Sequence, residues 1–89
     1  MALSKVTVVD KIEVLELGQV QVRTATRVLE DGVELSSSFH RHVVDPSTKI
    51  GDTWADTDIS GEDARVQAIA TTTWTDAVKT AYQEYVDAL

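Results

Sequence analysis

The residues best suited to chemistry in this sequence are two histidines separated by one arginine, His40-Arg41-His42. Alternate residues of a β-strand point to the same face, so the two imidazoles are spaced to share a divalent metal ion. In the strand register that we expect, His40 faces Arg23 across the sheet and His42 faces Gln21. A cationic neighbour disfavours a bound cation, so we assign no metal ligand and keep His40 and His42 only as a weak metal candidate.

Four basic or imidazole side chains, Arg23, Arg27, His40 and His42, are expected on that one polar sheet face. They are suited to two kinds of contact. One is a small anion, which would make the protein an anion- or metal-binding module. The other is a protein subunit, because arginine and histidine pair readily with the acids of a neighbouring surface. We favour the subunit contact and retain the binding module as the alternative.

A second candidate for metal chemistry begins at Asp56 and runs to Gly61, where oxygen-bearing residues alternate as they do in calcium loops. The twelfth position of such a loop requires a bidentate glutamate, and Gln67 occupies it. Ser60 followed by acids in a first helical turn explains the same residues as a capped helix start. We therefore expect no calcium site here.

The sequence shows no catalytic motif. None of its serines stands in a nucleophile elbow, and no phosphate-binding glycine loop, HExxH motif or dinucleotide fingerprint occurs. Cysteine is absent, which excludes disulfides, thiolate nucleophiles and cysteine-ligated metals. We expect a non-enzymatic protein without catalytic residues or a cofactor.

Length and charge narrow the class further. A chain of 89 residues forms one small domain with a thin margin of stability, so a homo-oligomer is expected. The net charge of −7 repels nucleic acids and anionic membranes. No signal-peptide run and no membrane-length apolar segment is visible, so we expect a soluble protein that binds neither nucleic acid nor membrane.

Residues 4–45 alternate in the manner of strands, and two turn signals divide them, Glu16-Leu17-Gly18 and Asp31-Gly32. A three-residue loop with a left-handed Gly18 and a two-residue type I′ turn at Asp31-Gly32 predict a three-stranded antiparallel meander. These turns also predict a register in which one face is apolar. Its expected pairs are Val14 with Val20, Ile12 with Val22, Val6 with Val28, Val28 with Leu35, Thr24 with Phe39, and Val20 with Val43.

The remaining residues predict a loop over 46–59 and a helical part over 60–89. Ser60 is expected to cap a first helix that ends near Ala70, and Thr75 to cap a second helix with a buried stripe. The fold class is therefore α+β: a three-stranded antiparallel meander followed by two C-terminal helices packed on one face, in a single domain over 1–89. The predicted strands exceed the usual length, so we expect hairpins that extend beyond the helices and need a partner.

Several segments carry a resemblance that spans most of the chain. Val20–Thr26, Ser38–Pro46, Gly61–Ile69 and Thr73–Thr75 are similar to small uncharacterised proteins of tailed bacteriophages and marine viral metagenomes. This chain departs from that pattern at Leu17 and Asp76, where asparagine and proline are expected. The resemblance transfers no functional residue. It implies a phage-like protein of the virion or host cytoplasm, a minor structural or accessory part that contacts phage structural proteins.

Overall fold

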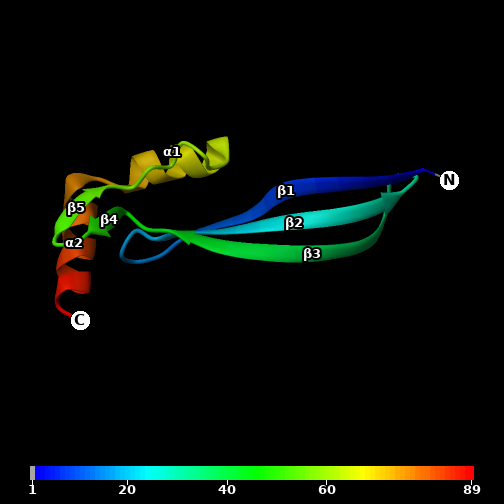
Figure 1. Ribbon diagram of the computed structural model, residues 1–89. Helices are drawn as coiled ribbons and strands as arrows, with labels where there is room; N and C mark the ends of the chain where they lie inside the picture. Colours follow the sequence, from blue (N-terminus) through cyan, green and yellow to red (C-terminus); the bar gives the residue numbers. More distant parts are fainter. Residues whose placement is uncertain (1) are drawn as a thin grey trace.

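The computed structural model describes residues 2–89 and has the expected α+β architecture (Figure 1). A three-stranded antiparallel sheet is followed by a short hairpin and two C-terminal helices. The elements are β1 (Leu3–Val14), β2 (Val20–Glu30), β3 (Val33–Val44), β4 (Ser47–Ile50), β5 (Thr53–Asp56), α1 (Ala64–Thr73) and α2 (Asp76–Asp87). The β4–β5 hairpin lies inside the segment predicted to be a loop.

Both predicted turns of the meander are confirmed. Gly18 has a left-handed backbone with φ of 87°, and its N–H donates to the carbonyl of Leu15. At the other end of β2, Asp31 and Gly32 both have positive φ, 50° and 82°, as a type I′ turn requires. The strands joined by these turns pair in the order β1-β2-β3.

The predicted register holds only next to the turns. Val14 opposes Val20, Ile12 opposes Val22, and Glu30 opposes Val33. Each strand pair then contains a β-bulge, one at Asp10 in β1 and one at Leu35 in β3. Each bulge inserts one residue without a partner, so all pairs beyond it shift by one and change face.

Four expected pairs were therefore wrong. The structure instead pairs Val6 with Arg27, Val28 with Ser36, Thr24 with His40, and Val20 with Val44. The alternation of polar and apolar residues along a strand cannot show where a bulge lies. Beyond a bulge the alternation continues unchanged, but each side chain now points to the opposite face. The expected apolar face consequently divides between the two sides of the sheet.

The core lies at the end of the sheet nearest to Gly18. Val66 and Ala70 of α1 pack with Val20, Val22 and Val44 of the sheet, and Trp74 completes this buried cluster. We call the sheet face toward α1 the inner face and the opposite face the outer face. The Trp74 indole N–H donates a buried hydrogen bond of 2.7 Å to the Gly18 carbonyl, which joins the first turn to the end of α1.

Both helices are capped, but the first cap differs from the expected one. Asp63, and not Ser60, is the N-cap of α1 and accepts from the Arg65 N–H at 2.9 Å. Ser60 lies in the preceding turn, where its N–H donates a hydrogen bond to the Asp58 carboxylate. Thr75 caps α2 as predicted, and α1 continues through the threonines to Thr73.

The β4–β5 hairpin is held to α2 by polar and aromatic contacts. Lys49 Nζ and Trp54 Nε1 both donate to the Asp87 carboxylate, at 2.7 and 3.2 Å. The Trp54 ring packs edge-on against Tyr82 with 5.9 Å between centroids. We call the unit formed by this hairpin and the two helices, residues 45–89, the helical end.

The molecule is strongly elongated, with extents of 56 × 24 × 21 Å. Its radius of gyration is 16.8 Å, whereas a compact domain of this length has about 12 Å. The radius is larger because the strands are 11 and 12 residues long and the helices cover only their ends near Gly18 (Figure 1). We call the projecting part of the sheet, residues 3–9 and 24–41, the arm.

Substituting Gly18 with alanine should destabilise the fold by about 3 kcal/mol or more in urea denaturation. A Cβ there would lie 2.5 Å from Val78 Cγ1 and 3.2 Å from Pro46 Cγ, on a backbone already at positive φ. Gly51→Ala is the matched control, because Gly51 also has positive φ (63°) but faces open space. Equal losses in the two variants would contradict the proposed packing at Gly18.

Candidate functional site

The arm presents most of its surface to solvent. Every residue from Asp31 to Arg41 is exposed, so β3 has no cover over most of its length. Five large apolar side chains of the arm are between 42% and 67% exposed: Leu3, Val6, Val33, Leu35 and Phe39. Val43, just beyond the arm on β3, is 52% exposed. Apolar groups concentrated in this way typically mark an interaction surface.

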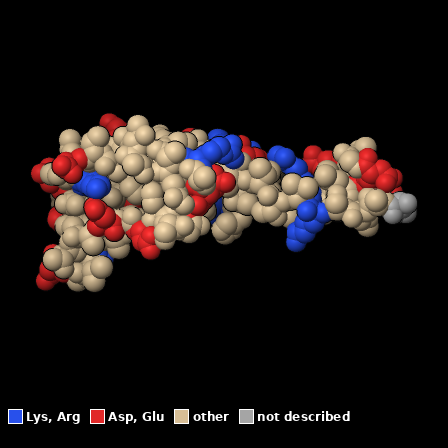
Figure 2. All heavy atoms as spheres, turned by 90° about the horizontal axis from the view of Figure 1, so that it is seen from above, with Lys and Arg blue, Asp and Glu red and all other residues tan. Residues whose placement is uncertain are grey.

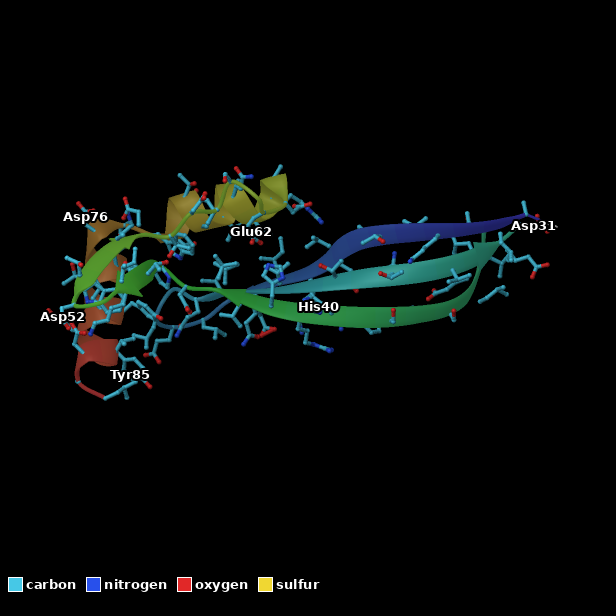
Figure 3. All side chains as sticks on the ribbon, viewed as in Figure 1. Asp31, His40, Asp52, Glu62, Asp76 and Tyr85 are labelled. Carbon is cyan, nitrogen blue, oxygen red and sulfur yellow. The ribbon has the colours of Figure 1, made fainter. Side chains whose placement is uncertain are left out.

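Charge is distributed unevenly along the molecule. Residues 45–89 carry nine acidic side chains and three basic ones, which makes the helical end strongly negative. Lysine and arginine atoms gather in the middle of the arm, while acids occupy its tip and the helical end (Figure 2). Asp31 marks that acidic tip in Figure 3.

Arg23 and Asp10 form an ion pair at the base of the arm. Nε and Nη2 of Arg23 each donate to an Asp10 carboxylate oxygen at 2.9 Å, and Arg27 Nη2 lies 4.0 Å from the same carboxylate. The hydrogen bond from Arg23 lowers the pKa of Asp10, with the charges of Arg23 and Arg27 adding to it against the cost of partial burial. The bulge at Asp10 is what brings this carboxylate within reach of the outer face.

Phe39 lies beside this pair on the outer face. The Arg23 guanidinium carbon is 4.5 Å from the centroid of the Phe39 ring, and that of Arg41 is 6.0 Å from it. Such cation–π contacts fix the Phe39 ring beside the two arginines. Phe39 is 47% exposed despite these neighbours.

The two histidines lie on the inner face, toward α1. His42 opposes Val22, and its Nε2 lies 2.7 Å from Glu62 Oε1. His40 opposes Thr24 and stacks beside His42, with 6.3 Å between ring centroids. Figure 3 shows Glu62 on the α1 side of the sheet and His40 on β3.

The four predicted contact residues are therefore not brought together. Arg23 and Arg27 lie on the outer face, and His40 and His42 lie on the inner face. The expected pairing of His40 with Arg23 and of His42 with Gln21 is wrong, because the bulge at Leu35 shifts β3 by one residue. The same shift turns Leu35, Phe39 and Val43 outward, away from the apolar face on which the sequence places them together with Val20.

A shallow hollow of about 160 Å³ lies on the sheet near the ion pair of Arg23 and Asp10. Its lining includes the cations Lys11, Arg23 and Arg41 together with Glu13. Lys11 pairs with Glu13 at 3.2 Å and Arg23 with Asp10. Among residues 2–89, no acid lies within ion-pair distance of Arg41, so this guanidinium is the cation of the hollow that can meet a ligand.

The part of the chain that the structure describes contains no group of three or more histidine, aspartate or glutamate side chains arranged to hold a metal ion. None of its helices is long and apolar enough to cross a membrane. No protein-family model, curated protein or solved structure matches the chain. Its function must therefore be inferred from its own geometry.

Replacing Arg23 with glutamine should raise the pKa of Asp10 toward its ordinary value of 3.8, because the charged hydrogen bonds are lost. With Arg23 present, the depressed pKa adds stability that is complete above the unfolded value of about 3.9 and disappears as pH falls through the folded value. Carbon NMR titration of the carboxyl groups measures the pKa, and urea denaturation at several pH values measures the stability.

Asp87 is the internal reference for that titration. Hydrogen bonds from Lys49 and Trp54 lower its pKa, and both lie on the helical end, away from Arg23. The Arg23→Gln variant should leave the pKa of Asp87 unchanged. An unchanged pKa at Asp10 would show that the pair does not persist in solution.

Proposed function

We propose that this chain is a non-enzymatic, phage-like protein, a minor structural or accessory part that acts through protein–protein contact along its arm. The observation that carries the proposal is the uncovered strand β3, whose residues Val33–Arg41 are all exposed. The fold devotes about a quarter of the chain to an arm that extends beyond the buried core cluster. Ordering these residues costs conformational entropy, and burial against another molecule would offset that cost.

The titratable groups support a contact role over a catalytic one. The shifted pKa values of Asp10, Asp58 and Asp87 arise from surface ion pairs and turn hydrogen bonds. Asp58 accepts a hydrogen bond from the Ser60 N–H within a turn, and the hollow near Arg41 is shallow. A binding surface needs neither perturbed acids nor a deep cleft.

The resemblance to small proteins of tailed phages supplies the biological setting of the proposal. Mass spectrometry of purified virions, from a phage whose genome encodes this chain, should detect it in particles or in assembly intermediates. Binding to a purified structural protein of the same phage should follow, and it should weaken in the Leu35→Ser/Phe39→Ser double variant. Absence from every particle and intermediate, together with no binding to any structural protein, would contradict the proposal.

A second function is supported by one observation: within residues 2–89, the guanidinium of Arg41 in the hollow has no ion-pair partner. In this alternative the protein is a small anion-binding module, and the hollow beside Arg41 is its binding site. Calorimetric titration with inorganic phosphate should then give heat that Arg41→Gln abolishes and that Arg27→Gln, outside the hollow, retains. Absence of heat in the unaltered protein, or heat that survives Arg41→Gln, would remove this alternative.

A further inference from the structure

The two edge strands of the sheet differ in how they are protected. On β1, the Asp10 bulge interrupts the edge, the Arg65 guanidinium binds the Val9 carbonyl, and Lys5 and Lys11 add charge. Bulges, lysines and covering groups of this kind prevent the edge of a sheet from pairing with another chain. The β1 edge is therefore protected against pairing with another strand.

The β3 edge has almost none of this protection. From Leu35 to Phe39 it carries no charged residue, and the whole strand lacks lysine and proline. Among residues 2–89, no side chain and no main-chain group outside the sheet hydrogen-bonds to the backbone of residues 33–44. Its one bulge lies near the tip, so Ser36–Val44 is a regular run with a free row of donors and acceptors.

The side chains of β3 are complementary to a reversed copy of the same strand. Leu35, Phe39 and Val43 are spaced by four residues and lie on the outer face, with exposures of 57%, 47% and 52%. Their spacing is symmetric about Phe39. An antiparallel copy centred there places Phe39 against its equivalent and Leu35 against Val43 in both directions, so each apolar side chain meets another.

Other registers fit less well. When two identical antiparallel strands are related by a two-fold axis, one residue at the axis must lie opposite the same residue of the other copy. Each alternative register is therefore defined by which residue lies at the axis. Centring on Ser38 sets Arg41 against Leu35, and centring on His40 sets Val43 against Ser37. Only the Phe39 register, of these three, matches all the apolar residues, and it sets Arg41 against Ser37 with no like charges directly opposed.

We propose that β3 pairs antiparallel with β3 of a second copy of this chain, centred on Phe39, so that two three-stranded sheets become one six-stranded sheet. This inference rests on the proposed contact function and names the partner of the arm. The pairing supplies about six to eight main-chain hydrogen bonds over the seven residue pairs from Ser36 to His42, with Leu35 and Val43 meeting at each end. It also removes the Phe39 ring, which the fold leaves half exposed, from water.

Light scattering during size exclusion, at two protein concentrations, tests the pairing. The unaltered protein should have the mass of a dimer, and Phe39→Asp should shift it to a monomer by opposing two carboxylates at the axis. Val6→Asp is the matched control, an exposed apolar residue on the β1 edge, and it should remain dimeric. Circular dichroism of each variant confirms that the monomer is folded.

A charge exchange tests the register independently. Ser37→Lys opposes Arg41 of the second copy and should weaken the dimer tenfold or more, and adding Arg41→Glu should restore it. A monomeric unaltered protein, or a dimer lost with Val6→Asp and kept with Phe39→Asp, would overturn the inference. If such a monomer binds a phage structural protein, the contact function stands and only the choice of partner is wrong.

Discussion

The buried hydrogen bond from the Trp74 indole to the Gly18 carbonyl fixes where the helices meet the sheet. Gly18 has no side chain, so Val78, Pro46 and Trp74 close directly over its backbone. The first turn, the end of α1 and the start of α2 therefore converge on one point. Two helices of 10 and 12 residues anchored there cannot extend along strands of 11 and 12 residues, because a strand rises about twice as far per residue as a helix. The projecting arm follows from that anchor.

The arm holds its shape with few buried groups. Beyond the core cluster, its order depends on the ladders of β1 and β3 to the central β2, and on the outer-face contacts of Asp10, Arg23 and Phe39. Ala25, fully buried in the middle of this sheet, shows how closely the larger side chains of the outer face pack around it. An arm of this kind is stable as a three-stranded sheet, yet it keeps one edge and one apolar row available for another molecule.

Much of the fold was predictable from the sequence because its turns have distinctive residues. Gly18 and Asp31-Gly32 located the strand ends, and Thr75 located the start of α2. The candidate surface was not predictable, because the bulges at Asp10 and Leu35 depend on tertiary pairing and leave the alternation of residues intact. One signal was nevertheless present: the expected apolar face of the sheet included Leu35, Phe39 and Val43, whereas two short helices offered too little apolar surface to cover them. The β4–β5 hairpin was missed because its strands have only four residues each and no apolar alternation.

The central claim is that the free edge of β3 is a self-pairing surface, and a distance between two copies tests it most directly. The chain contains no cysteine, so Thr7→Cys on β1 accepts a single nitroxide label at a site away from the proposed contact. Pairing through β3 centred on Phe39 places the two Thr7 backbones about 25 Å apart, five strand spacings across and two residues along. Pulsed electron–electron resonance should therefore give a distance distribution near that value, broadened by the label. A distribution far shorter, as pairing through β1 would give, or the absence of any dipolar signal, would contradict the account.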